Sequence, residues 1–180
     1  MRTITIELYP FDELNMATQK KVLEKYHDIN TDHDWWNNVY YMYTETLKKQ
    51  GFTCNKDFTF SLYTQGHNAR IESASLDLIE WIKCDPKNRD RFSTLNEWIN
   101  GFNISSGRVD HDHIGDAPET VDDLYDELHE IIQAEVNEIQ EHMLRDLYSD
   151  CDYLSSDEAI KDTFEANEYT FESDGTMRNA

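Results

Sequence analysis

The sequence predicts an α+β protein: an antiparallel or mixed sheet of about 4–6 short strands packed with several helices. Three observations favour this class: short segments of alternating polarity, segments of helical periodicity between them, and one long acidic helix in the C-terminal half. With 38% hydrophobic and 12% aromatic residues, the 180-residue chain has enough apolar material for a core. Only six Gly and three Pro argue against long flexible linkers, so we expect a single domain over residues 1–180.

The first expected element is a strand over residues 3–9. Polarity alternates there with a period of two, which places Ile4, Ile6 and Leu8 on one face. Pro10 has no N–H to donate and should end the strand.

Two helices are expected next. The first covers residues 16–29, with Asn15 as its N-terminal cap. The second covers residues 32–50, begins at a capping-box pattern that starts with Thr31, and ends at Gly51.

The middle of the chain carries shorter patterns. Strands are expected at 58–66 and 69–75, the second returning beside the first, and a hairpin strand is expected at 103–113. Short helical pieces are expected at 76–82 and 94–99, around a polar loop at 84–91.

The C-terminal third is predicted to contain an acidic helical region over residues 116–166. A long helix should run over 119–148, and a capping-box pattern at Ser155 should open a second helix that reaches residue 166. The chain then alternates again over 168–173, before a turn at Asp174 and the following glycine.

The net charge of −21 is unusual and unevenly distributed. Residues 1–115 hold 17 acidic and 13 basic residues, whereas residues 116–180 hold 20 acidic and 3 basic residues. Such a concentrated negative field disfavours nucleic acid and anionic membranes as direct ligands. It favours a basic protein partner and speeds its association.

The cysteines and the N-terminus indicate a cytoplasmic protein. Cys54, Cys84 and Cys151 are odd in number, far apart and outside any CxxC pattern, which favours a reducing compartment. The N-terminus lacks the apolar core of a leader peptide, and no run approaches the length of a membrane span.

Residues 119–142 contain nine carboxylates and no Lys or Arg. An apolar stripe is expected on one side of this helix, formed by Val121, Leu124, Leu128, Ile132, Val136, Ile139 and Met143. A solvated helix face would suffice to explain a charge run. Carboxylates three and four residues apart repel, however, by roughly 0.2–0.5 kcal/mol per pair, and attraction of a cationic surface would explain why they are kept.

The spacing of these carboxylates allows a more specific hypothesis. From Glu119 to Glu141 they fall at about one per 3.7 Å of helix axis, close to the roughly 3.4 Å per phosphate of one DNA strand. The helix could therefore occupy a groove that normally holds a nucleic-acid backbone. Glu135 and Asp146 fall beside the apolar stripe, and we expect Arg or Lys partners for them.

We predict a partner-binding surface made of the carboxylates that face away from the stripe, continued by those that follow: Asp122, Asp123, Asp126, Glu127, Glu130, Glu138, Glu141, Asp150, Asp152, Asp157 and Glu158.

Other chemistry-bearing patterns are weak. His111 and His113 have the spacing of two metal ligands on one face of a strand, but the sequence does not identify a third ligand. No nucleophile elbow, Walker loop, GxGxxG, HExxH or EF-hand pattern is present. We therefore predict no enzyme activity, no catalytic residues, no metal and no cofactor.

The chain resembles a group of small acidic proteins from bacteriophages and prophages, often labelled antitoxins of toxin–antitoxin stability systems. The resemblance lies in 9-YPFDEL-14, 34-DWWNNVY-40, 58-FTFSLYTQG-66 and 153-YLSSDEAIKDTFEANEYTFESDG-175. Residues 63–69 read YTQGHNA where the group has WSQGDGA, so no shared function of this turn is inferred. The resemblance implies a phage setting, in which small acidic proteins that block host defence enzymes are common.

Together these observations predict a phage-type, non-enzymatic inhibitor that mimics nucleic acid and acts against restriction, CRISPR or another host defence. Its partner would be a basic nuclease or DNA-binding protein in the bacterial cytoplasm, with no direct contact to nucleic acid or membrane. One alternative is an antitoxin-like protein that neutralises a basic toxin. A third is a metal-dependent enzyme that uses His111 and His113.

Overall fold

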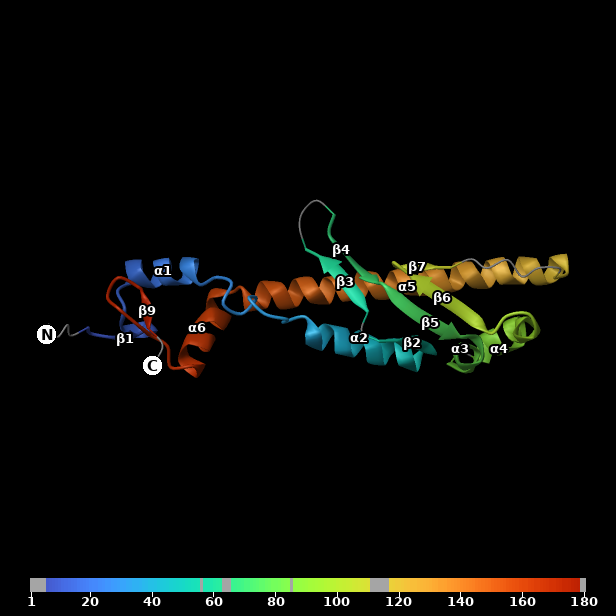
Figure 1. The fold of residues 1–180 in the computed structure, drawn as a ribbon, viewed down its shortest axis with the longest axis horizontal. Helices are drawn as coiled ribbons and strands as arrows, with labels where there is room; N and C mark the ends of the chain where they lie inside the picture. The colour runs from blue at the N-terminus through green and yellow to red at the C-terminus, as the bar shows by residue number, and fades with distance from the viewer. Residues whose placement is uncertain (1–5, 56, 63–65, 85, 111–116, 179–180) are drawn as a thin grey trace, which may run out of the picture. The chain divides into compact units, whose positions relative to one another are not determined.

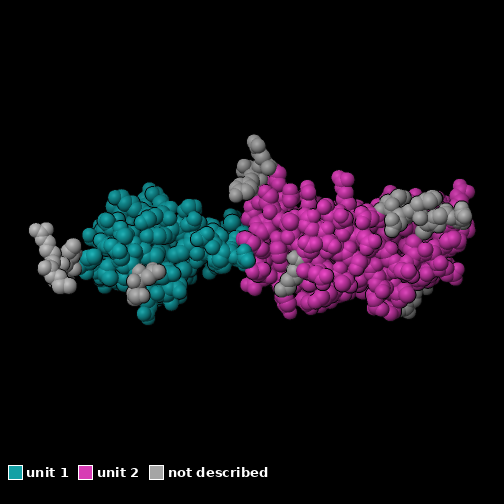
Figure 2. Space-filling view, viewed as in Figure 1, with its two compact units in different colours: residues 1–35, 149–180 teal, residues 36–148 magenta. Residues whose placement is uncertain are grey.

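A computed structural model describes residues 6–55, 57–62, 66–84, 86–110 and 117–178 (Figure 1). The chain forms two compact units, residues 1–35 with 149–180 (unit 1) and residues 36–148 (unit 2), coloured separately in Figure 2. The α+β class is confirmed, with antiparallel strands and one long helix in the C-terminal half. The expectation of a single domain over residues 1–180 stays a prediction.

Unit 1 combines short strands with two helices. Its elements are β1 (Tyr9–Pro10), η1 (Phe11–Glu13), α1 (Met16–Lys25), α6 (Asp157–Ala166), β8 (Thr170–Phe171) and β9 (Met177–Arg178). The strands form an antiparallel sheet in the order β1-β8-β9. Its core is aromatic: the rings of Phe164 and Phe171 lie 5.1 Å apart, and Phe11 packs against both. The burial of these rings joins the two ends of the sequence.

The strand predicted at 3–9 is wrong for the residues that the structure describes. Only Tyr9 and Pro10 pair with another strand, and Ile6 and Leu8 are 48% and 47% exposed. Alternating polarity makes a segment compatible with a sheet, but a strand also needs a neighbour for its N–H and C=O groups. The part of this prediction that concerns residues 3–5 lies outside the described residues.

Side-chain caps start both helices of unit 1. Asn15 caps α1 as predicted, since its Oδ1 accepts from the N–H of Thr18 at 3.0 Å. The α6 cap is Ser156, which accepts from the N–H of Ala159 at 3.2 Å, and not Ser155. Each cap satisfies an N–H that the first helical turn leaves without a partner.

Unit 2 holds most of the strands. Its elements are α2 (Asn37–Lys49), β2 (Phe52–Cys54), β3 (Phe58–Ser61), β4 (Asn68–Ile71), β5 (Ser73–Asp77), α3 (Leu78–Cys84), α4 (Pro86–Phe92), η2 (Ser93–Glu97), β6 (Gly101–Ser105), β7 (Arg108–Val109) and α5 (Glu119–Leu154). The last six residues of α5 belong to unit 1. The strands form one antiparallel sheet in the order β2-β5-β6-β7 and a separate antiparallel pair, β3-β4.

Several elements of unit 2 differ from expectation: the strand expected at 58–66 ends at Ser61, the one expected at 103–113 is the pair β6 and β7, and the helix expected at 119–148 reaches Leu154. The helix predicted from residue 32 begins at Asn37, because the Thr31 hydroxyl donates to the Asp28 carbonyl instead of capping the next helix. The polar loop predicted at 84–91 contains α4, which begins at Pro86, a residue type favoured at the first helical position. The strand predicted at 69–75 is two strands, β4 and β5, in two different sheets.

The four-stranded sheet buries one face and exposes the other. Phe52, Leu76 and Phe102 are direct neighbours across β2, β5 and β6, and all three are buried. Along each strand, the side chains that alternate with the buried ones point to the other face of the sheet and are exposed. α5 covers the buried face in part, since the ring of Tyr125 stacks on that of Phe102 at 5.4 Å.

The buried tyrosines of α2 make the stability of unit 2 sensitive to alkaline pH. Tyr40 packs its ring 5.0 Å from that of Phe58 and is 8% exposed, and burial raises its pKa from 10.0 to about 12. As pH rises, Tyr40 therefore loses its proton in the unfolded chain before it does so in the folded protein. Its contribution to the free energy of unfolding is complete below pH 10 and is lost as pH rises from 10 to 12.

We expect Tyr40→Phe to flatten the loss of unfolding free energy above about pH 10, because it removes the group whose ionisation opposes folding. Urea unfolding measured at a series of alkaline pH values checks this. Tyr41→Phe, at an exposed position on the same helix, is the matched control. Equal flattening by both substitutions would contradict the assignment to Tyr40.

A candidate protein-binding surface on α5

α5 buries one stripe of side chains along unit 2. The fully or nearly fully buried residues are Tyr125, Leu128, Ile132, Val136, Ile139, Met143 and Leu147. Five of the seven residues predicted for the stripe are among them, whereas Val121 and Leu124 are only partly buried. Tyr125 takes the first place instead, because Phe102 of β6 provides a flat apolar partner for its ring.

Polar side chains fix the rotation of α5 against the strands. Gln133 Oε1 accepts from the N–H of Val109 at 2.8 Å, and Gln140 Oε1 accepts from the N–H of Ile71 at 3.0 Å. His129 adds a hydrogen bond at 3.2 Å between its Nε2 and the Val109 carbonyl. These contacts satisfy N–H groups of β7 and β4 that strand pairing leaves open. Together with the buried stripe, they fix the rotation of α5 and so determine which of its side chains face solvent.

Most of the predicted carboxylates of unit 2 face solvent. Those that are exposed are Asp122, Asp123, Asp126, Glu130, Glu138 and Glu141, whereas Glu127 is partly buried. Glu119, at the start of the helix, is exposed as well. With 100° per residue, six of these exposed residues fall within an arc of roughly 100°, and five of the six lie in the first turns of the helix. We name Glu119, Asp122, Asp123, Asp126 and Glu130 the acidic face.

The remaining four predicted residues belong to unit 1. Asp150, Asp152, Asp157 and Glu158 are all exposed there. A partner-binding role for these four stays a prediction.

Glu127 is paired within the protein. Arg91 of α4 approaches it with Nη2 at 2.5 Å from Oε1 and 2.7 Å from Oε2. Both side chains remain partly exposed, so the pair stabilises unit 2 by at most about 1 kcal/mol. It nevertheless removes one negative charge from the set available to a partner.

Glu135 and Asp146 both accept hydrogen bonds from aromatic residues, and the Arg or Lys partners expected for them stay a prediction. Trp81 Nε1 donates to Glu135 at 2.9 Å, and the Tyr43 hydroxyl donates to Asp146 at 2.6 Å. Burial and the hydrogen bond to Asp146 raise the pKa of Tyr43. Both carboxylates are therefore engaged within unit 2.

These internal contacts reduce the regularity of the charge spacing. Without Glu127 and Glu135, seven carboxylates remain between Glu119 and Glu141, about one per 4.7 Å of helix. About 12 Å of axis separates Glu130 from Glu138. The charge is thus concentrated in the acidic face, at the first three turns of α5, and is followed by a smaller pair at Glu138 and Glu141.

A metal site at His111 and His113 stays a prediction. His111 and His113 lie outside the described residues. Within the described ranges, no cluster of three or more His, Cys, Asp or Glu side chains has the arrangement of a metal site. The described helices also include none that combines the length and the apolar character needed to cross a membrane.

The fold and the surface define an α+β protein with an anionic helix packed against a sheet. No protein-family model, curated protein or solved structure matches the chain. The resemblance to acidic phage proteins therefore stays a prediction.

Proposed function

We propose that this protein is a phage-type, non-enzymatic inhibitor whose acidic face imitates a nucleic-acid backbone. It would bind the basic groove of a host defence nuclease or DNA-binding protein in the bacterial cytoplasm. The observation that carries the proposal is the acidic face itself. It places five exposed carboxylates within twelve residues of one helix, and the first Lys or Arg along that helix is Arg145.

The way α5 is held makes this surface suitable for binding. Gln133 and Gln140 anchor the helix to backbone groups, and the buried stripe packs against the sheet. The carboxylates are therefore positioned before a partner arrives, which lowers the entropy lost on association. Their mutual repulsion, roughly 0.2–0.5 kcal/mol per neighbouring pair, is relieved when a cationic groove neutralises them.

If the proposal is correct, this protein and nucleic acid compete for the same groove of the partner. The chain, immobilised through its C-terminus, is incubated with lysate of the bacterial host, and the captured protein is purified and identified. We expect duplex DNA to displace it competitively, and its association rate to fall steeply between about 50 and 200 mM salt.

Two results separate the rival functions. A captured protein that does not bind nucleic acid and is not displaced by DNA contradicts mimicry, and a small basic toxin in that role supports the antitoxin alternative. An association rate that is insensitive to salt contradicts both functions, because each depends on electrostatic steering.

A further inference from the structure

A polar hollow of about 630 Å³ lies beside α5 in unit 2, where α5 meets β4 and the β6–β7 hairpin. Its volume is within the range of roughly 300–1,000 Å³ that holds small ligands. Among the residues that the structure describes, the lining contains no carboxylate, in a chain of net charge −21: it consists of Arg70, Ser106, Gly107, Arg108, Gln133, Asn137 and Gln140.

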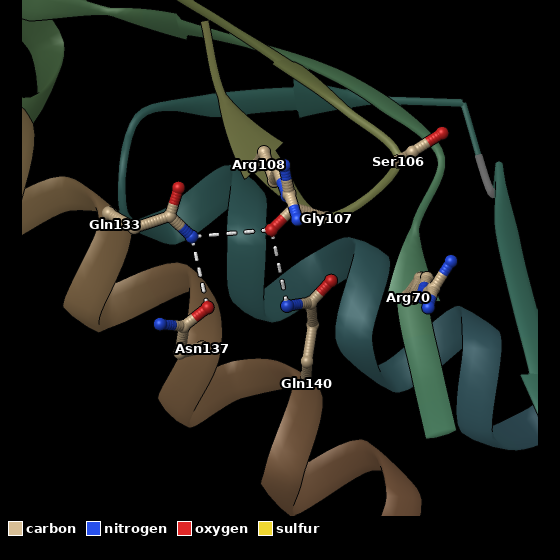
Figure 3. A pocket seen from close by; sticks show the side chains of 7 residues that line it. All are labelled: Arg70, Ser106, Gly107, Arg108, Gln133, Asn137 and Gln140. Atoms are coloured by element: carbon tan, nitrogen blue, oxygen red, sulfur yellow. Dashed lines mark hydrogen bonds between the residues drawn. The ribbon is translucent and has the colours of Figure 1, made fainter. Parts of the chain in front are cut away.

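The hydrogen-bond acceptors of this lining are already engaged. Figure 3 shows the Gly107 carbonyl accepting from the amide nitrogens of Gln133 and Gln140, at 3.2 and 3.5 Å. Asn137 Oδ1 accepts from Gln133 Nε2 at 2.9 Å. The side-chain oxygens of the two glutamines accept from the backbone of Val109 and Ile71.

The same network fixes the orientation of each amide. A backbone N–H can only donate, so the Gln133 atom that meets Val109 and the Gln140 atom that meets Ile71 must be oxygens. The NH₂ group of Gln133 therefore donates to Asn137, and the Asn137 atom that accepts this hydrogen bond must be the side-chain oxygen. This leaves the NH₂ group of Asn137 as a donor without a partner among the described residues.

The two arginines add strong donors. Arg70 comes from β4 and Arg108 from β7, both are exposed, and neither forms an ion pair within the described part of the chain. Each guanidinium carries five N–H donors and no acceptor. Ser106 points away from the hollow in Figure 3, because its hydroxyl donates to Glu72 at 3.0 Å.

Glu72 is not one of the lining residues, and its carboxylate is hydrogen-bonded to other side chains. Its carboxylate accepts hydrogen bonds from the hydroxyls of Thr59 and Ser106, which lower its pKa, and the charge of Arg70 lowers it a little further. The carboxylate thus remains ionised and hydrogen-bonded on the strand side. The capacity left open in the hollow is that of donors with two positive charges.

We propose that this hollow binds a small oxyanion, the phosphate or carboxylate group of a low-molecular-weight ligand, between Arg70, Arg108 and the amide of Asn137. One guanidinium group can donate two parallel hydrogen bonds to two oxygens of a phosphate or carboxylate, and its positive charge strengthens both bonds. Glu72, which accepts from Ser106, and Glu141, four residues after Asn137 on α5, oppose the anion, so binding depends on the charge-assisted hydrogen bonds of the two guanidinium groups. The site is independent of the acidic face and of the function proposed for it.

Titration of the ¹⁵N-labelled full chain with inorganic phosphate, and separately with malonate, at constant ionic strength tests the site. We expect saturable shifts of the Asn137 side-chain NH₂ and of the Gly107 and Arg108 amides. Stronger binding of phosphate identifies a phosphate-bearing ligand, and stronger binding of malonate identifies a carboxylate. Absence of saturable shifts at these groups with both anions overturns the proposal, and this test needs no variant.

Variants show whether the two arginines carry the binding. Arg70→Gln with Arg108→Gln is expected to weaken it at least about tenfold, since charge-assisted hydrogen bonds are lost. Arg145→Gln, exposed on α5 outside the lining, removes one charge and should change affinity less than about twofold. Equal weakening by Arg145→Gln and by either single substitution, Arg70→Gln or Arg108→Gln, would show a diffuse charge effect and overturn the site.

Discussion

Reversing Asp122, Asp123 and Glu130 to lysine is expected to weaken binding of the basic partner by at least about 100-fold, close to 3 kcal/mol or more. All three side chains are exposed members of the acidic face. Each substitution removes an attraction and places a like charge against the cationic groove, so both effects act in the same direction. The association rate should show most of the loss at low salt.

The choice of these three positions avoids internal contacts. Glu127 is left unchanged because a lysine there would face Arg91 and destabilise α4. Circular dichroism and urea unfolding should show a folded variant, with stability equal to or above that of the parent chain, because repulsion along α5 is relieved.

A matched control separates the face from the total charge. Asp57, Glu97 and Asp110 are exposed residues of unit 2 outside α5, and their reversal to lysine changes the net charge by the same amount. We expect this control to reduce binding less than about fivefold. Equal losses for the two triple variants would contradict a role for the acidic face and indicate attraction by net charge alone.

The features predicted correctly from the sequence are those that depend on neighbouring residues. The Asn15 cap, the stop at Gly51 and the start of α5 follow from local hydrogen bonding and helical periodicity. Gly51 has φ 86°, and a Cβ there would lie 2.7 Å from the backbone nitrogen of Trp81, so glycine is required on two grounds. The exposure of most carboxylates on α5 belongs to the same class.

The features that the sequence did not predict depend on contacts between distant segments. Nothing near Gln133 or Gln140 indicates that they meet strands β7 and β4, because amides on a helix are ordinarily solvated. Arg70 and Arg108 are 38 residues apart, and a hydrogen bond of 2.7 Å from the N–H of Gly107 to the Ile71 carbonyl joins their two strands. A partner strand, present for Tyr9 and absent for Ile6, likewise cannot be deduced from alternation alone.

The largest loss of stability from an α5 carboxylate is expected at Glu135, where Glu135→Ala should lower the unfolding free energy by about 1–3 kcal/mol. Trp81 is 3% exposed, and its indole N–H donates to Glu135 at 2.9 Å. Removal of the carboxylate leaves this buried donor without that acceptor. The cost of leaving it unsatisfied outweighs the better helix propensity of alanine, a few tenths of a kcal/mol.

Glu138→Ala is the matched control, since it removes the same side chain from an exposed position three residues further along α5. It relieves repulsion and is expected to leave stability unchanged or raise it by a few tenths of a kcal/mol. Glu135→Gln keeps an acceptor oxygen and should retain most of the stability that alanine loses. Urea unfolding followed by tryptophan fluorescence measures all three variants. If Glu135→Ala were as stable as Glu138→Ala, the carboxylate would have no structural role, and it would have to be counted again among the charges available to a partner.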